Sequence, residues 1–78
     1  MSATIVDITV HIDEDLNDRE LINLEQAVRS DEGVVSVGHN GKGRHLIMVL
    51  YNAEEIRGKD ILNRVTDQGF HGELVGFL

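Results

Sequence analysis

Apolar and polar residues alternate near the start of the chain, and the spacing then changes to that of a helix. Residues 4–12 place an apolar side chain at every second position, which predicts a strand with one buried face. That face consists of Val6, Ile8, Val10 and Ile12. Residues 18–30 place apolar side chains three or four positions apart, which predicts an amphipathic helix. Its apolar stripe consists of Leu21, Leu24, Ala27 and Val28.

The junction between these two elements carries a helix start signal. Asn17 can accept hydrogen bonds from N–H groups of the first turn, and Glu20 can reach back to the N–H of Asn17. The pair therefore predicts a capping box, with Leu16 and Leu21 placed to pack against each other across the cap. Nearby carboxylates suit the positive end of the helix dipole: Asp13, Glu14, Asp15 and Asp18.

The middle of the chain predicts a β-hairpin. Residues 34–39 and 45–51 are rich in β-branched and apolar residues, and glycines lie between them. If Asn40 opposes Arg44, the register pairs His39 with His45, Val37 with Ile47 and Val35 with Val49. Leu46, Met48 and Leu50 then point to the opposite face of the sheet from Ile47 and Val49.

Glycines are predicted to end both helices. Gly33 follows the first helix, and Gly69 follows a second amphipathic segment at residues 58–68. Both suit the left-handed position just beyond a helix, which glycine adopts without steric cost. Residues 71–78 are predicted to form the last strand.

The order strand, helix, strand, strand, helix, strand predicts an α+β fold. Two right-handed crossovers give a ferredoxin-like βαββαβ sandwich, in which the four-stranded antiparallel sheet has the order 4-1-3-2. Both helices are expected on one face of the sheet, and the other face is expected to be open. A chain of 78 residues has room for one core, so residues 1–78 are predicted to form one domain.

Composition narrows the function classes. The formal net charge is −7, which argues against nucleic acid or an anionic membrane as a partner. The chain has no cysteine, and therefore no disulfide and no thiolate metal site. Neither a signal peptide nor a membrane span is predicted, so we expect a cytoplasmic location. No catalytic arrangement stands out, so we do not expect an enzyme.

The apolar pattern resembles that of the heavy-metal-associated domain family. The residues that carry the resemblance are Leu24-Glu25-Gln26-Ala27-Val28, Gly33-Val34, Val37, Val49, Tyr51, Ile61, Leu62, Val65, Gly69-Phe70 and Glu73-Leu74. The resemblance implies the same ferredoxin-like fold. It also implies a soft ion such as Cu(I), bound by a Cys-x-x-Cys pair where the first strand meets the first helix. The two cysteine positions correspond to Asn17 and Glu20, which offer no thiolate, so the resemblance does not extend to that activity.

The predicted topology gathers the histidines toward one end of the sheet. With one carboxylate they form a candidate site for a divalent metal such as Zn(II), Ni(II) or Cu(II), which imidazole and carboxylate ligands suit. The candidate ligands are His11, His39, His45, His71 and Asp13. Strand parity places His11 on the open face but His39 and His45 on the core face. Solvated histidines at the rim of the sheet are the alternative interpretation, and no other cofactor is predicted.

The open face is the stronger functional lead. Its predicted apolar residues are Ile5, Leu46, Met48, Leu50, Val75 and Phe77. A contiguous exposed apolar patch often marks an interface, although a small domain can also leave an open sheet face apolar without using it. We therefore predict a small, non-enzymatic module that binds a protein partner or a second copy of itself through this face. A divalent-metal binding or trafficking domain is the alternative, and a small-ligand regulatory module has no supporting motif.

Overall fold

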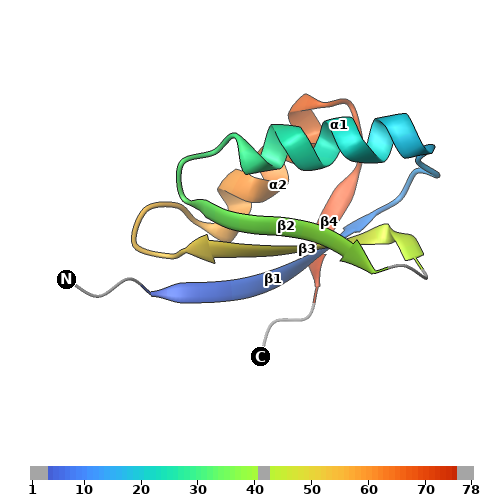
Figure 1. Ribbon diagram of the computed structural model, residues 1–78. Coiled ribbons are helices and arrows are strands. Elements are labelled where there is room, and N and C mark those ends of the chain that lie inside the picture. Colours follow the sequence, from blue (N-terminus) through green and yellow to red (C-terminus); the bar gives the residue numbers. More distant parts are fainter. Residues whose placement is uncertain (1–3, 41–42, 76–78) are drawn as a thin grey trace.

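The computed structural model describes residues 4–40 and 43–75, and it confirms the ferredoxin-like sandwich (Figure 1). The elements in chain order are β1 (Ile5–Ile12), α1 (Asp18–Arg29), β2 (Val34–Asn40), β3 (Gly43–Asn52), α2 (Gly58–Asp67) and β4 (Gly72–Val75). The antiparallel sheet has the order β2-β3-β1-β4, as predicted. Both helices cover one face of the sheet, and the other face is open (Figure 1).

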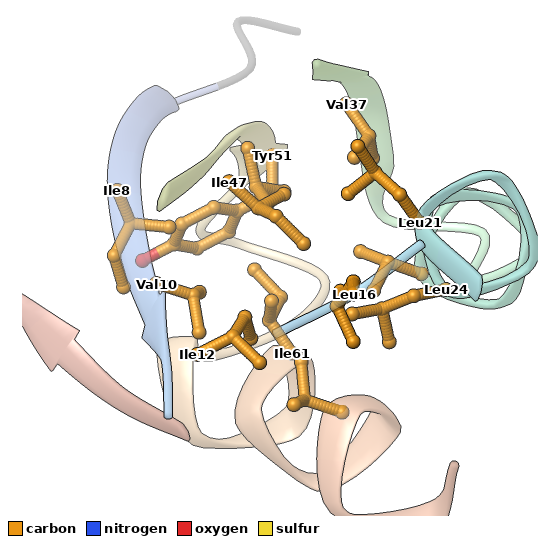
Figure 2. Packing of buried hydrophobic residues seen from close by; sticks show 13 residues of the cluster. Ile8, Val10, Ile12, Leu16, Leu21, Leu24, Val37, Ile47, Tyr51 and Ile61 are labelled. Atoms are coloured by element: carbon orange, nitrogen blue, oxygen red, sulfur yellow. The ribbon is translucent and has the colours of Figure 1, made fainter. Parts of the chain in front are cut away.

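The core lies between the sheet and the two helices (Figure 2). The alternation in β1 predicts the buried residues Ile8, Val10 and Ile12 correctly, whereas Val6, predicted on the same face, is 37% exposed. Both helices contribute a buried stripe, which consists of Leu21, Leu24 and Val28 from α1 and of Ile61 and Val65 from α2. Apolar burial of this kind is the main term that stabilises the fold, and it places the opposite side chains of every strand on the open face.

The predicted capping box is present at the start of α1. The Asn17 side-chain oxygen accepts a hydrogen bond from the Glu20 backbone N–H at 2.8 Å. The Glu20 carboxylate accepts one from the Asn17 backbone N–H at 3.0 Å. Leu16 and Leu21, the two predicted flanking residues, are both buried. The cap therefore fixes where the chain leaves β1 and enters α1.

We expect Asn17→Ala to lower the free energy of unfolding by about 0.5–2 kcal/mol, because it leaves N–H groups of the first turn without their partner. Urea unfolding of the wild type and the variant measures this difference. Asn63→Ala is the matched control, since Asn63 is an exposed asparagine within α2. Equal unfolding midpoints for Asn17→Ala and wild type would show that the cap does not stabilise the helix.

The predicted hairpin register is wrong. Val37 pairs with Val49 and His39 pairs with Ile47, so β2 is displaced by two residues from the expected pairing. The displacement arises between Asn40, which pairs with Gly43, and His39, which pairs with Ile47; a second irregularity lies between Val34 and Ser36. Val35, which was expected on the core face, lies in this second irregularity and is 57% exposed. A displacement of two residues keeps side-chain parity, so the assignment of β3 residues to the two faces is still correct.

The second helix ends as predicted, but the first does not. Gly69 follows α2 with φ 91°, the left-handed conformation that favours glycine. The α1 helix ends at Arg29 with Ser30 as its C-cap, and Gly33 lies in the turn before β2 without a positive φ. The last strand begins at Gly72, one residue later than predicted, and its described part extends to Val75; Phe77 lies outside the described residues.

Candidate functional site

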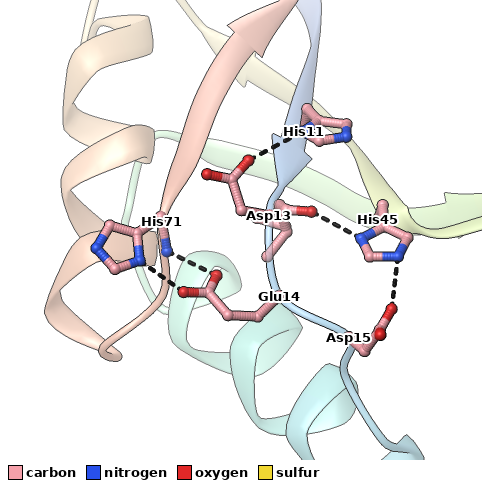
Figure 3. Close-up of polar contacts among 7 residues, drawn as sticks. His11, Asp13, Glu14, Asp15, His45 and His71 are labelled. Carbon is pink, nitrogen blue, oxygen red and sulfur yellow. Dashed lines mark hydrogen bonds and ion pairs between the residues drawn. The ribbon is translucent and has the colours of Figure 1, made fainter.

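The loop between β1 and α1 is held by two histidines, one from β3 and one from the turn before β4 (Figure 3). Residues 13–15 of this loop are all carboxylates: Asp13, Glu14 and Asp15. His45 approaches from β3, and His71 approaches from the turn that precedes β4. The topology therefore brings most of the predicted histidine cluster to one end of the sheet.

Glu14 binds His71 through both of its carboxylate oxygens. The His71 ring Nδ1–H donates to one oxygen at 2.6 Å, and the His71 backbone N–H donates to the other at 2.8 Å. The backbone N–H of Asp13 also donates to the His71 carbonyl at 2.8 Å. These three hydrogen bonds join the start of β4 to the β1–α1 loop. Sequence reasoning missed them, because Glu14 and His71 are 57 residues apart and no local pattern indicates the contact.

His45 bridges the end of β1 and the same loop. Its Nδ1–H donates to the Ile12 carbonyl at 2.8 Å, and its Nε2 lies 2.8 Å from an Asp15 carboxylate oxygen. Both nitrogens can donate only when the ring is a charged imidazolium, which this environment favours. The His45 ring also stacks on His11, with centroids 6.0 Å apart, and the Nδ1 of His11 lies 3.4 Å from Asp13. Strand parity alone does not predict that stacking.

The contacts shift three pKa values in the direction that favours charge. Hydrogen bonds from His71, first from its ring and then from its backbone N–H, lower the pKa of Glu14 below its ordinary value of 4.5. The Glu14 carboxylate raises the pKa of His71 above 6.5. The Ile12 carbonyl is the largest cause of a raised pKa at His45, and Asp15 adds to it, while partial desolvation of the ring works against both.

We expect these contacts to stabilise the fold most between pH 4.5 and 6.5. The contribution of His45 and His71 to the free energy of unfolding is complete below their pKa in the unfolded chain, and it is lost as the pH rises through their higher pKa in the folded protein. The contribution of Glu14 is complete above its unfolded pKa and is lost as the pH falls through its lower folded value. Urea midpoints at about pH 5.5 and about pH 8.5 should therefore differ more in wild type than in the double variant His45→Gln, His71→Gln. An identical difference in both proteins would contradict this account.

The predicted metal ligands do not all come together. His39 is engaged elsewhere, where its Nδ1 lies 2.9 Å from a Glu25 carboxylate oxygen on α1. His11, His45 and His71 each contact a different carboxylate, respectively Asp13, Asp15 and Glu14. Within residues 4–40 and 43–75, no three His, Asp or Glu side chains are arranged to hold a metal ion. The metal site stays a prediction, and Zn(II) that moved all four imidazole resonances together would confirm it.

The open face of the sheet forms the second candidate site. Ile5, Leu46, Met48 and Leu50 are exposed there, and Val75 is half-buried. The strand pairing makes these residues neighbours, because Met48 on β3 lies beside Thr9 on β1, and Thr9 lies beside Val75 on β4. On its other side Met48 lies beside Gly38 of β2, which has no side chain to cover it. The exposed apolar residues are therefore next to one another and not scattered.

Two carboxylates share this face with the apolar residues. Asp7 lies beside Leu50, and Glu73 lies beside His11. Both are exposed, and neither makes an ion pair or side-chain hydrogen bond within the described part of the chain. The outer edge of β2 differs from the face, because the Arg29 guanidinium donates to the Val37 carbonyl at 2.9 Å and already occupies one backbone acceptor there.

Solved structures of metal-handling domains superpose closely on this chain. Oxidized MerP from Ralstonia metallidurans gives a TM-score of 0.84 at 14% identity, covering 94% of this chain and 100% of that one. The N-terminal domain of a potential copper-translocating P-type ATPase from Bacillus subtilis gives 0.83 at 20% identity, covering 94% and 90%. A copper-binding domain from the P-type ATPase HMA7 gives 0.82 at 18% identity, covering 90% and 93%.

The chain has the heavy-metal-associated fold. No protein-family model matches the sequence, and no curated protein does. The fold therefore bears out the structural part of the resemblance found in the sequence. At the junction of β1 and α1 the chain has Asn17 and Glu20, which hydrogen-bond as a helix cap, and no cysteine is present anywhere in the sequence. No helix among the described residues is long and apolar enough to cross a membrane.

Proposed function

We propose that this chain is a protein-interaction module that binds a partner protein on the open face of its sheet. The observation that supports the proposal is the run of neighbouring exposed apolar side chains opposite the helix-covered face. Binding of a soft ion such as Cu(I) through thiolates is not an alternative function, because such ions select sulfur ligands and the chain has no cysteine. On this account the chain keeps the fold of metal-handling domains and uses a different surface.

The other surfaces of the molecule are less suited to docking. The apolar stripes of α1 and α2 are buried against the sheet, so neither helix has a free apolar face of comparable continuity. At the β2 edge, Arg29 occupies the Val37 carbonyl, which hinders the addition of another strand there. At the opposite edge the described part of β4 has four residues. Among the described residues, it is on the open face that exposed apolar side chains lie next to one another.

Met48 is the residue on which the test depends, because it lies between Thr9 and Gly38 at the centre of the face and is 46% exposed. A library of random peptides would be selected against the wild-type protein, and the dissociation constants of the selected peptides measured for Met48→Glu. We expect the dissociation constant to rise at least about tenfold, because burial of a methionine is worth about 1.5–3 kcal/mol and the new carboxylate would have to be desolvated.

Ile22→Glu is the matched control for this experiment. Ile22 is also apolar and is 53% exposed, but it lies on α1 and away from the open face. We expect this variant to bind the selected peptides as the wild type does, and NMR spectra of both variants would verify that they are folded. A selection without binders, or binders that are indifferent to Met48→Glu, would contradict the proposed function.

A further inference from the structure

The side chain of Met48 offers oxidation chemistry that docking does not use. Two residues of the chain contain sulfur, Met1 and Met48, and no cysteine is present. Met1 lies outside the described residues, whereas Met48 lies at the centre of the open face. We infer that Met48 is a site of reversible oxidation to the sulfoxide, and that this modification abolishes docking on the open face. The loss of docking rests on the proposed function, whereas the oxidation itself does not depend on it.

The Met48 side chain is accessible to a small oxidant. It is 46% exposed and lies outside the buried core, which contains its chain neighbours Ile47 and Val49. On β2 its neighbour is Gly38, and a Cβ atom at Gly38 would meet nothing within 4 Å among the described residues. The sheet therefore leaves open space beside Met48. The susceptibility of methionine sulfur to oxidation rises with such exposure.

Few other groups of the chain compete with Met48 for an oxidant. Thiolates are the side chains that peroxide normally attacks first, and this chain has no cysteine. The chain has no tryptophan, and its single tyrosine, Tyr51, is only 8% exposed. Within the described part of the chain, the thioether of Met48 is therefore the one sulfur that an oxidant can reach. We expect oxidation of the folded protein to be selective for this position.

The modification is a balanced two-electron step. Hydrogen peroxide transfers an oxygen atom to the thioether sulfur: the O–O bond breaks, a sulfur–oxygen bond forms and water leaves. The sulfur is oxidised and the peroxide is reduced. A methionine sulfoxide reductase reverses the step with two electrons from a dithiol, which becomes a disulfide while the oxygen leaves as water. The exposure of Met48 gives both the oxidant and the reductase access to it.

Oxidation changes the open face without disturbing the core. The sulfoxide oxygen is a polar hydrogen-bond acceptor, which water solvates in the free protein because the side chain is exposed. An apolar partner that covered Met48 would remove this water, and an acceptor that is buried without a donor is unfavourable. The oxidised protein should therefore stay folded and lose its affinity for the partner.

Treatment of the wild-type protein with hydrogen peroxide, followed by peptide mapping by mass spectrometry, tests the site. We expect an added oxygen on Met48 and earlier elution of the protein from a hydrophobic-interaction column, because the open face becomes more polar. The peptides selected from the random library should bind the oxidised protein with a dissociation constant at least about tenfold higher. Treatment with a methionine sulfoxide reductase and a dithiol should restore both the elution and the binding.

Met48→Leu is the matched control, because leucine is apolar and similar in volume to methionine but has no sulfur. This variant keeps Met1, so any effect of oxidation there appears in both proteins. Each protein is compared with itself before and after peroxide, and we expect the elution and the dissociation constant of Met48→Leu not to change.

Four results would overturn the inference: a Met48 that stays unmodified, an oxidised protein that binds as before, an equal effect of peroxide on Met48→Leu, or loss of the folded NMR spectrum on oxidation. A selection without binders would contradict the proposed function and, with it, the loss of docking. The mapping and the elution would still decide whether Met48 is the oxidation site.

Discussion

Replacing Leu24 by alanine should lower the free energy of unfolding by about 2–5 kcal/mol, the largest loss we expect from a single change in this chain. Leu24 is fully buried and points from α1 into the core between the helices and the sheet (Figure 2). Its removal loses apolar burial and leaves a cavity that the packed surroundings only partly fill. In a chain of 78 residues such a loss is a large part of a net stability of about 5–15 kcal/mol.

Ile22→Ala on the same helix is the control. Ile22 is 53% exposed, so the change should alter the free energy of unfolding by no more than about 0.5 kcal/mol. Urea unfolding of both variants, with the slope of the transition compared with that of wild type, separates a loss of stability from a change in the unfolded state. Similar midpoints for Leu24→Ala and Ile22→Ala would mean that α1 does not pack as described.

The features that sequence reasoning predicted correctly depend on residues that are close together in the chain. The capping box joins Asn17 to Glu20, three residues away, and hydrogen-bonding chemistry alone indicates it. The alternation in β1 and the helical spacing in α1 are equally local, and together they specify which faces are buried. With short connections and right-handed crossovers, those faces are compatible with few topologies, and the observed strand order is the predicted one.

The contacts that were not predicted join distant parts of the chain. Glu14 and His71 meet because β4 pairs with β1. Which carboxylate of the β1–α1 loop reaches His71 depends on the path of that loop. His39 illustrates the same limit, since its partner Glu25 lies on α1 and not among the other histidines. The displaced register of β2 was also not predictable, because the irregularity between His39 and Asn40 that causes it has no distinct local signature. A ligand set chosen from topology alone could therefore not distinguish a metal centre from separate ion pairs.

The residues of the open face were predictable from strand parity, because a displacement of two residues leaves each side chain on the same face of the sheet. Leu46, Met48 and Leu50 alternate with the buried residues Ile47, Val49 and Tyr51, so they must lie opposite the helices. What the sequence could not indicate is which side chains lie between them across the sheet. The pairing places Thr9 and Gly38 on the two sides of Met48 and Asp7 beside Leu50.

The physical role of Gly33 differs from the one that its position in the sequence suggests. Its position after α1 suggests a left-handed cap, yet α1 ends at Ser30 and Gly33 has no positive φ. The backbone of Gly33 is buried instead, and its carbonyl accepts a hydrogen bond from the Asn52 N–H at 2.8 Å. A Cβ atom at this position would meet Ile56 Cγ1 at 2.7 Å and Cγ2 at 2.8 Å. Close packing, and not backbone conformation, is what requires glycine here.

Gly33→Ala should therefore lower the free energy of unfolding by about 1–3 kcal/mol, the usual cost of inserting a methyl group into packed surroundings. Ile56 cannot easily yield, because it is β-branched and packs against the core. Gly38→Ala is the control: a Cβ there would meet no atom within 4 Å, so alanine should leave stability unchanged or slightly raise it. If Gly33 were instead a left-handed cap, Gly33→Ala would still destabilise, but the double variant Gly33→Ala, Ile56→Ala would not recover any of the loss. Recovery in that double variant, measured as coupling in a double-mutant cycle, identifies the Ile56 contact as the cause.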